Sequence, residues 1–330
     1  MADPPPLTER LDAFMARANA AYYASHDPFA DFTTAPEISQ VFGEVLGLWA
    51  AVTWQMLGSP DMVMLIEAGP GRGTLMADAL RAIGRAMPAF RAALSVRFIE
   101  TSPRLRAEQA TRVPDAVWHD SLDDVPEGPT ILLANEFLDA LPIRQFIRRG
   151  EGWKERFVSE GAFVERPHAD VLPDAPDGSI LERCEPAQAF VAALGTRFAR
   201  HKGAALFLDY GPEHSGYGDS LQALAGGKPA DPLAAPGLAD LTAHVDFAAL
   251  AAAARAAGAS VHGPAPQGMF LAELGLFQRA NRLARGLPPA QAAAVMESVR
   301  RLGEPNRMGR LFKALAIASA GCPPLPGLGG

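Results

Sequence analysis

Short runs of apolar residues alternate along this chain with longer segments in which apolar residues recur at helical spacing. The apolar runs predict strands at 62–66, 96–99, 116–118, 130–134, 205–208 and 312–318. The segments between them predict helices, as in the alanine-rich "VDFAALAAAARAAGA", whose helix is expected to close on Gly258. Strands that alternate with helices indicate a mostly parallel sheet with helices on both faces, which is an α/β fold.

Residues 1–57 are expected to form a helical segment ahead of this sheet. In "TTAPEISQVFGE" the pair Thr34 and Glu37 has the spacing of a capping box, and Pro36 falls in the first turn. A helix is therefore predicted to begin there. The same two side chains could instead line a binding site, and the two roles are compatible.

Two regions interrupt the alternation within residues 58–330. An insertion is expected at about 143–200, because "RQFIRRGEGWKERFVSEGAFVER" alternates polar and apolar residues as antiparallel strands do. The second region, 211–240, is rich in glycine and proline. We expect a long loop there, and a loop of that length in a compact domain is usually a lid or a binding surface.

Composition limits the partners and the compartment. The 330 residues carry a net charge of −7 and no basic run, so we expect no nucleic-acid partner. The isolated cysteines Cys184 and Cys322, and histidines without metal-type spacing, predict neither a disulfide framework nor a metal site. The start "MADPPPLTER" resembles no targeting peptide, and the uncharged stretch 45–60 is too short to span a membrane. These features predict a cytoplasmic protein without membrane insertion.

The stretch "MVMLIEAGPGRGTL", residues 62–75, describes a strand that enters a glycine-rich loop and then a helix. A nucleoside-triphosphate loop requires glycine and then lysine five and six residues after its first glycine. After Gly69 this chain has Thr74 in the first of these positions, and no lysine follows. The dinucleotide fingerprint requires glycines at relative positions 1, 3 and 6; Gly69 and Gly71 fit, but the third glycine is Gly73. The loop therefore fits neither group of ligands well.

Glu-x-Gly-x-Gly-x-Gly, with an acid at the strand end, is the loop that S-adenosylmethionine (SAM) enzymes use. The segment Gly69-Pro70-Gly71, followed by Gly73, would let the backbone approach the amino-acid half of SAM, whose carboxylate meets amide groups near the helix start. Glu67 would accept the ammonium group. The alternative is a tight turn between strand and helix without any ligand.

The next two strands also end in polar residues. Glu100 and Thr101 follow the strand at 96–99, and an acid at this position accepts hydrogen bonds from ribose hydroxyls. Asp120 and Ser121 follow the third strand and could meet the adenine edge. The alternative for Glu100 is a solvated loop acid.

The fourth strand runs into "LLANEFLDALP". Asn135 and Glu136 would then lie at the carboxyl edge of the sheet, where doubly wound folds bind ligands, with Asp139 one helical turn further on. The fifth strand likewise ends in Asp209. The alternative is that the acids after Asn135 only begin a helix, near its positive end.

In this order the motifs "DFTTAPEISQVFGE", "EAGPGRG", "ETSPRLR…Q", "ANEFLDALP", "DYG", "DLTAHVDF", "QGMFLAELGL" and "MGRLFKALA" resemble the MidA-like methyltransferases. The resemblance covers roughly residues 20–320 and implies a Rossmann-like class I SAM-dependent fold with a seven-stranded, mostly parallel sheet. It also implies protein-arginine N-methyl transfer. The family includes a mitochondrial complex I assembly factor, whose target is a complex I subunit beside the quinone site, modified to symmetric dimethylarginine.

Arginine methylation requires a group that accepts a proton from the guanidinium, which is a very weak acid. Because the guanidinium pKa is about 13.8, full deprotonation at pH 7 would cost about 9 kcal/mol, whereas a positioned base contributes roughly 3–5 kcal/mol. Carboxylates that hold the cation and accept its proton as the bond forms are therefore expected. Glu136 is the first candidate, followed by Asp139 and Glu37.

Three functions are compatible with these residues. The first is a SAM-dependent arginine methyltransferase that acts on a respiratory complex I subunit. Such an enzyme could also form a homodimer. The second is a SAM-binding assembly chaperone without turnover. The third is a nicotinamide-dependent oxidoreductase, which Thr74 in the dinucleotide fingerprint disfavours.

Overall fold

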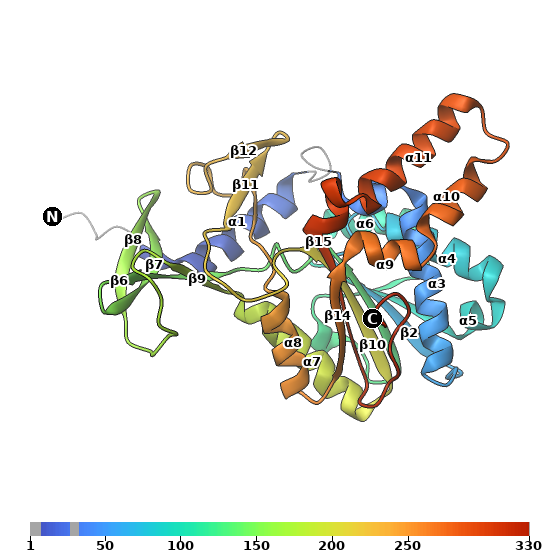
Figure 1. Ribbon diagram of the computed structural model, residues 1–330, viewed down its shortest axis with the longest axis horizontal. Coiled ribbons are helices and arrows are strands. Elements are labelled where there is room, and N and C mark those ends of the chain that lie inside the picture. The colour runs from blue at the N-terminus through green and yellow to red at the C-terminus, as the bar shows by residue number, and fades with distance from the viewer. Residues whose placement is uncertain (1–7, 27–32, 330) are drawn as a thin grey trace.

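The computed structural model describes residues 8–26 and 33–329 (Figure 1). Parts of the predicted N-terminal helical segment, 1–7 and 27–32, lie outside the described residues, as does Gly330. The remainder forms a central sheet with helices on both faces, and a smaller antiparallel sheet stands beside it in Figure 1. The helix α1 (Leu11–Ser25) runs between these two parts.

The central sheet has seven strands in the order β14-β15-β10-β5-β2-β3-β4. In chain order they are β2 (Val63–Ala68), β3 (Leu94–Ile99), β4 (Val117–His119), β5 (Thr130–Asn135), β10 (Gly203–Tyr210), β14 (Ser260–Pro266) and β15 (Phe312–Ala318). All neighbouring pairs are parallel except those of β15, which is antiparallel to β10 and to β14. The predicted seven-stranded, mostly parallel sheet is therefore confirmed.

The strand β14 was not among the strands predicted from apolar runs. Its sequence "SVHGPAP" contains a glycine and two prolines, and its pairing with β15 is irregular between His262 and Ala265. An edge strand tolerates proline because one side of its backbone needs no partner. Its place at the sheet edge thus explains why the hydrophobic pattern does not reveal it.

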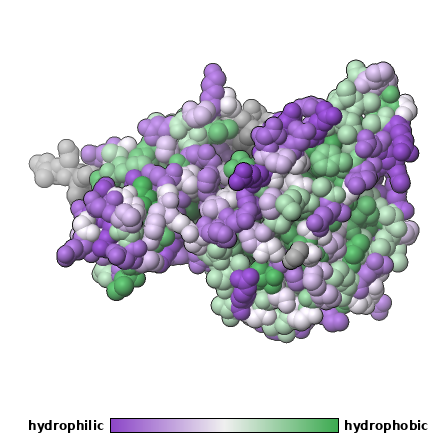
Figure 2. Space-filling model, viewed as in Figure 1, coloured by the Kyte–Doolittle hydropathy of each residue, from purple (hydrophilic) through white to green (hydrophobic). Residues whose placement is uncertain are grey.

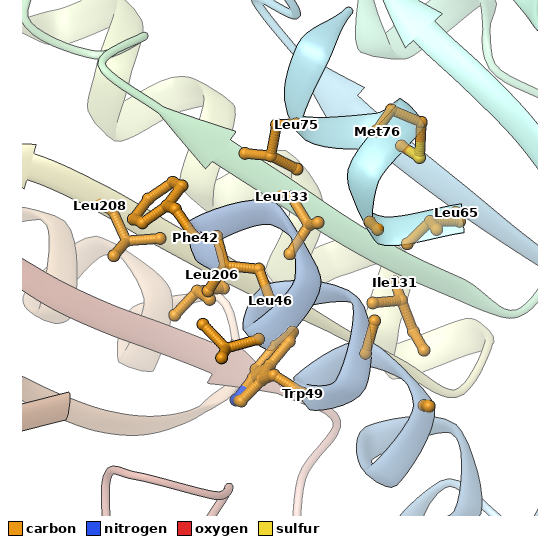
Figure 3. Packing of buried hydrophobic residues seen from close by; sticks show 14 of the residues in the cluster. Phe42, Leu46, Trp49, Leu65, Leu75, Met76, Ile131, Leu133, Leu206 and Leu208 are labelled. Atoms are coloured by element: carbon orange, nitrogen blue, oxygen red, sulfur yellow. The ribbon is translucent and has the colours of Figure 1, made fainter. Parts of the chain in front are cut away.

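The two faces of the central sheet have separate hydrophobic cores. On one face Leu65, Ile131 and Leu206 pack against Phe42 and Trp49 of α3 (Gln40–Met56), as Figure 3 shows. On the other face, alternate residues of the same strands pack against α7 (Glu185–Arg200) and α8 (Phe247–Ala256). Burial on both faces explains the continuous apolar runs of these strands.

Helices α3 and α4 (Thr74–Ala86) pack closely because α3 has glycines at the contact. A Cβ on Gly43 would lie 2.7 Å from the Asp78 Cβ, and one on Gly47 would lie 2.7 Å from the Ala79 Cα. The neighbouring Glu44 is buried and bonds to Arg81 of α4. Close backbone contact and a buried ion pair therefore fix α4 against α3.

Shorter helices complete the layers. They are α5 (Pro88–Ala93), α6 (Pro103–Arg112), α9 (Gln267–Glu273), α10 (Leu276–Ala284) and α11 (Pro289–Gly303). Helices α10 and α11 project together from the body in Figure 1. Arg279 of α10 makes a second ion pair with Glu44, at 2.6 Å, which ties this projection to α3.

The predicted capping box at Thr34 is wrong. A four-residue helix, α2 (Ala35–Ile38), begins after Thr34, but the Thr34 side chain makes no capping hydrogen bond. Ser39 is extended and separates α2 from α3. The Glu37 carboxylate instead accepts a hydrogen bond from the Thr74 hydroxyl at the start of α4.

The predicted antiparallel insertion contains β6 (Arg144–Arg149), β7 (Gly152–Ser159), β8 (Ala162–His168) and β9 (Ile180–Arg183). The N-terminal strand β1 (Thr8–Arg10) joins this sheet by pairing with β7. Residues 185–200, which the prediction included in the insertion, form α7 on the central sheet.

The prediction of a long loop at 211–240 is only partly right. The strands β11 (Gln222–Ala225), β12 (Lys228–Ala230) and β13 (Asp240–Thr242) form a small antiparallel sheet. Gly226 and Gly227 both have positive φ, as the two central residues of a tight hairpin turn require. The glycines therefore mark a hairpin within this region.

The surface in the same view mixes hydrophilic and hydrophobic residues (Figure 2). None of the helices in the described part of the chain is long and apolar enough to cross a membrane.

The contact between α3 and α4 predicts opposite effects for two helical glycines. Gly47→Ala should lower the free energy of unfolding by about 1–3 kcal/mol, because the new methyl group overlaps Ala79. Gly84→Ala, on α4 with no atom within 4 Å of its Cβ position, should raise it by about 0.5–1 kcal/mol. Urea unfolding of both variants measures the difference; equal effects would contradict the close approach of the two helices.

Candidate functional site

A cavity of about 590 Å³ lies where β2, β3 and β5 end. Its wall includes the glycine-rich loop after β2, residues 100–103 after β3 and residues 135–137 at the end of β5. Helices α1 and α2 contribute further wall residues, including Tyr23 and Glu37, and residues 140–142 also line the cavity. The carboxyl ends of neighbouring parallel strands thus bring most of the predicted site residues together.

The glycine-rich loop needs its glycines because the backbone adopts positive φ and because a side chain would have no space. Gly69 has φ +63°, and a Cβ there would lie 2.9 Å from Cδ2 of Phe137. Gly73 has φ +79° and caps the N-terminus of α4. Its amide donates to the carbonyl of Pro70 at 2.7 Å, which closes the loop. The loop and the helix start therefore form one backbone surface beside the cavity.

Glu67 ends β2 and is only 3% exposed. Burial raises its pKa well above the usual value, and a hydrogen bond from the Met76 amide acts in the opposite direction. Its Oε2 atom is buried without a hydrogen-bond partner. A buried carboxylate that lacks a partner suits a cationic ligand such as an ammonium group.

Glu100 is held by the loop that follows β3. Its carboxylate accepts hydrogen bonds from the Ser102 amide at 2.7 Å and from Nε2 of Gln109 at 3.2 Å, while burial raises its pKa. Thr101 and Ser102 lie beside it on the cavity wall. These hydrogen bonds fix the orientation of the carboxylate and leave it on the cavity wall, as a group that binds ribose hydroxyls requires.

Gln109 holds two residues of the cavity wall from behind, a role that the sequence did not predict. It is completely buried on α6 and donates through Nε2 to the Gly71 carbonyl at 2.7 Å as well as to Glu100. Its Oε1 accepts from the Trp118 indole at 2.7 Å. One amide therefore connects the glycine-rich loop, the Glu100 carboxylate and β4. A polar residue one turn after Leu105 on the buried face of a helix was the available signal.

Asp120 and Ser121 are not on the cavity wall. The Asp120 side chain is 76% exposed and forms an ion pair with Arg106, which also bonds to the Glu100 carbonyl. Ser121 forms a capping box with Asp124 for a short turn. The structure therefore shows local contacts for these two residues after β4, and neither lines the cavity.

Glu136 follows β5 in a strained conformation, with φ +49°. Its Oε1 accepts hydrogen bonds from the Ala35 amide of α2 and from Nδ2 of Asn135, both at 3.0 Å. Burial raises its pKa. No helix begins at Glu136, so the prediction of Asp139 one helical turn further on is wrong. The segment 136–142 is a turn instead.

Asp139 lies in this turn, buried and off the cavity wall. The backbone amides of Leu138 and Asp139 donate to Oδ2 of Asp209, at 3.0 and 3.2 Å, so the Asp209 carboxylate holds the turn. Burial raises the pKa of Asp209 to about 7. Burial and the charge of Asp209 raise the pKa of Asp139 well above its usual value. Several acids therefore crowd behind Glu136.

Several residues of the cavity fit SAM. Glu67 offers an unpartnered carboxylate oxygen for an ammonium group, the glycine-rich loop lines the wall with its backbone, and Glu100 offers acceptors for hydroxyl groups. Among the described residues no group of histidine, cysteine and carboxylate side chains could hold a metal ion.

Comparison with known proteins gives the family. Residues 45–265 match the sequence profile of a family described as S-adenosyl-L-methionine-dependent methyltransferases. The chain is 34% identical to the Drosophila melanogaster protein named "Protein arginine methyltransferase NDUFAF7 homolog, mitochondrial", over 95% of the chain and 81% of that protein. It is 32% identical to the human protein of the corresponding name, over 94% of the chain and 79% of that protein.

A solved structure is also similar along nearly the whole chain. It is a COG1565 superfamily protein from Burkholderia thailandensis, bound to S-adenosyl-homocysteine. The TM-score is 0.80 with 28% sequence identity, over 98% of this chain and 89% of that one. These comparisons confirm the predicted fold class and the predicted cofactor, SAM.

The prediction of a cytoplasmic protein is corrected by the same comparisons. The Drosophila, zebrafish and human relatives are all named as mitochondrial proteins. The relatives therefore do not support the cytoplasmic prediction.

The contacts of Gln109 predict a role in cofactor affinity. Gln109→Met keeps the size of the side chain but removes its hydrogen bonds to Gly71 and Glu100, so the affinity for SAM should fall by about tenfold or more. Calorimetric titration with SAM measures it. Thr111→Val, at an exposed position of the same helix, is the control and should bind SAM normally. Unchanged affinity in Gln109→Met would show that the glutamine serves packing alone.

Proposed function

This chain belongs to the family of S-adenosyl-L-methionine-dependent methyltransferases that includes the NDUFAF7 enzymes, and from this premise we propose that it methylates an arginine side chain of another protein. The observation that carries the proposal is Glu136, a carboxylate held on the wall of the cofactor cavity by bonds to Ala35 and Asn135. The names of the relatives support arginine as the target.

The residues that would hold the cofactor come from two strand ends. Glu67 would bind the ammonium group, the loop from Gly69 to Gly73 would bind the carboxylate through backbone amides, and Glu100 and Thr101 would bind the ribose. SAM supplies an electrophilic methyl group on a sulfonium. The protein contributes alignment of the attacking nitrogen with that methyl group, which carries much of the catalysis in an in-line displacement.

Glu136 would hold the guanidinium and receive its proton. The carboxylate can accept charge-assisted hydrogen bonds from two guanidinium nitrogens. As one nitrogen forms its bond to the methyl group, its acidity rises and its proton passes to the carboxylate. Because burial raises the pKa of Glu136, this carboxylate is a better proton acceptor than one in water.

We extend the proposal to the target by the resemblance of the motifs to the MidA-like family. The substrate is then a subunit of respiratory complex I, modified to symmetric dimethylarginine during assembly. The alternative is a SAM-binding assembly factor without turnover. Both would bind SAM, so only the product distinguishes them.

Removal of the gene tests the target. Mass spectrometry should show loss of dimethylation at one arginine of a complex I subunit, with reduced assembly of the complex. Reintroduction of the normal gene should restore both. If a Glu136→Gln gene restored assembly without methylation, the chaperone alternative would be favoured; an unchanged methylation map would refute the proposed target.

Glu136→Gln tests the catalytic role. Glutamine keeps the oxygen that accepts from Ala35 and Asn135 but loses the charge, so methyl transfer should fall by about 100-fold or more. The affinity for SAM should change little. Glu37→Gln is the matched comparison and should have a smaller effect, because the Glu37 carboxylate bonds to Thr74. Turnover and SAM affinity are measured for both; normal turnover by Glu136→Gln would move the catalytic role elsewhere.

A further inference from the structure

Positive charge is concentrated in one part of this acidic protein. Residues 276–310 form α10, α11 and the short helical turn η3 (Pro305–Gly309). They contain seven arginines and only two acids, Glu297 and Glu304, so the segment carries a net charge of +5, whereas the whole chain carries −7. In Figure 2, hydrophilic residues gather over the places where α10 and the C-terminal half of α11 lie in Figure 1.

Three of these arginines have acidic partners. Arg279 pairs with a buried carboxylate of α3. Arg300 lies 3.9 Å from the Glu304 carboxylate, and Arg307 forms ion pairs with Glu304, at 3.4 Å, and with Glu297. Both acids of the segment are therefore already engaged.

The other four arginines are exposed, and within residues 8–26 and 33–329 their side chains form no ion pair or hydrogen bond. We call them the arginine surface; they are Arg282, Arg285, Arg301 and Arg310. In the antiparallel insertion, by contrast, Arg144, Arg149 and Arg156 each form an ion pair with an acid. The many acids of this chain thus leave the arginine surface uncompensated.

The arginine surface begins beside the cofactor cavity. Helix α11 packs against α2, whose residues line part of the cavity wall, and η3 packs against α11. Burial raises the pKa of Glu136, and the charge of Arg301 acts in the opposite direction, so this guanidinium lies close enough to influence the cavity. Arg282 and Arg285 lie toward the outer end of the projection, on one side of α10. The surface therefore extends outward by about 20 Å, the length of a helix such as α11.

Nucleic acids, anionic membranes and acidic proteins could each complement positive charge. A helix that lies on a membrane exposes large apolar side chains, but in the described part of the chain no such exposed side chain belongs to residues 276–310. Nucleic acid requires a concentrated basic footprint, whereas these arginines are interspersed with Glu297 and Glu304 on an acidic protein. An acidic protein surface, whose charges are also spaced apart, fits best.

We propose that the arginine surface binds an acidic face of the protein substrate and so holds that protein over the cavity. The inference rests on the proposed function, from which it takes a protein substrate, and it adds the charge of the face that is recognised. Arginine suits this role because its planar guanidinium binds a carboxylate through two parallel hydrogen bonds. None of the four arginines lines the cavity, so they act on substrate association and leave the methyl-transfer step unchanged.

An acidic polymer tests the surface without any methyl transfer. The protein loaded with S-adenosylhomocysteine is titrated with short fluorescent poly-L-glutamate, and the Kd is measured by anisotropy. Arg282→Gln/Arg301→Gln removes two charges but keeps helix-forming side chains, so the Kd should rise by about fivefold or more. Added salt should weaken binding to the unaltered protein. Arg166→Gln/Arg255→Gln removes two exposed charges of β8 and α8 and should leave the Kd unchanged.

Two results of this titration would overturn the proposal. The first is an equal Kd for Arg282→Gln/Arg301→Gln and its control variant. The second comes from a single-stranded oligonucleotide and from vesicles that contain anionic phospholipid, titrated under the same conditions. Each should bind more weakly than poly-L-glutamate, and tighter binding of either would assign the surface to that class of partner instead.

The substrate gives a second readout, which separates this inference from the proposed function. With the complex I subunit as substrate, Arg282→Gln/Arg301→Gln should raise KM by about fivefold or more and leave kcat within about twofold. A short peptide around the methylated arginine, which does not reach the surface, should be methylated equally by both proteins. An unchanged KM for the subunit would leave the methyltransferase function and overturn this inference. Binding of poly-L-glutamate without methyl transfer to any protein would refute the function and leave the arginine surface.

Discussion

The parallel pairing of β2 with β3 and with β5 is the constraint on which the site depends. The registers place Ala68 beside Ile99 and beside Ala134, so the three strands end at the same level. Every polar group that follows these strands therefore reaches one edge of the sheet, although Glu67 and Asn135 are far apart in sequence. Hydrophobic burial on both faces fixes this register, because a slip by one residue would exchange the two cores.

A second layer of contacts closes the cavity over this edge. Asn19 of α1 donates to the carbonyls of Ala140 and Leu241 and accepts from the Leu241 amide. The Tyr23 hydroxyl donates to Asp240 of β13. One helix thus joins the turn after Glu136 to the small sheet of residues 222–242. The N-terminal segment is part of the site, because it supplies both a wall and the bonds that hold that wall.

The sequence predicted the parts of the site that follow directly from a strand. Glu67, Glu100 and Glu136 each stand at or after the end of an apolar run, and parallel strands bring such positions together. The order of the sequence motifs indicated the family, and the family together with the glycine-rich loop indicated the cofactor. The prediction was less successful where a residue acts through a distant partner: the bonds of Gln109, and the contact between Glu37 and Thr74, depend on how helices pack.

The conformation of Glu136 places a limit on how this position can evolve. A positive φ costs a side chain with a Cβ about 1–2 kcal/mol, and glycine or asparagine would relieve that strain. Neither carries a carboxylate, so backbone preference and charge favour different residues at this position. A descendant that had lost the need for the charge would gain stability by drifting to glycine or asparagine here. Glutamate at this position therefore carries a backbone cost that its hydrogen bonds to Ala35 and Asn135 help to offset.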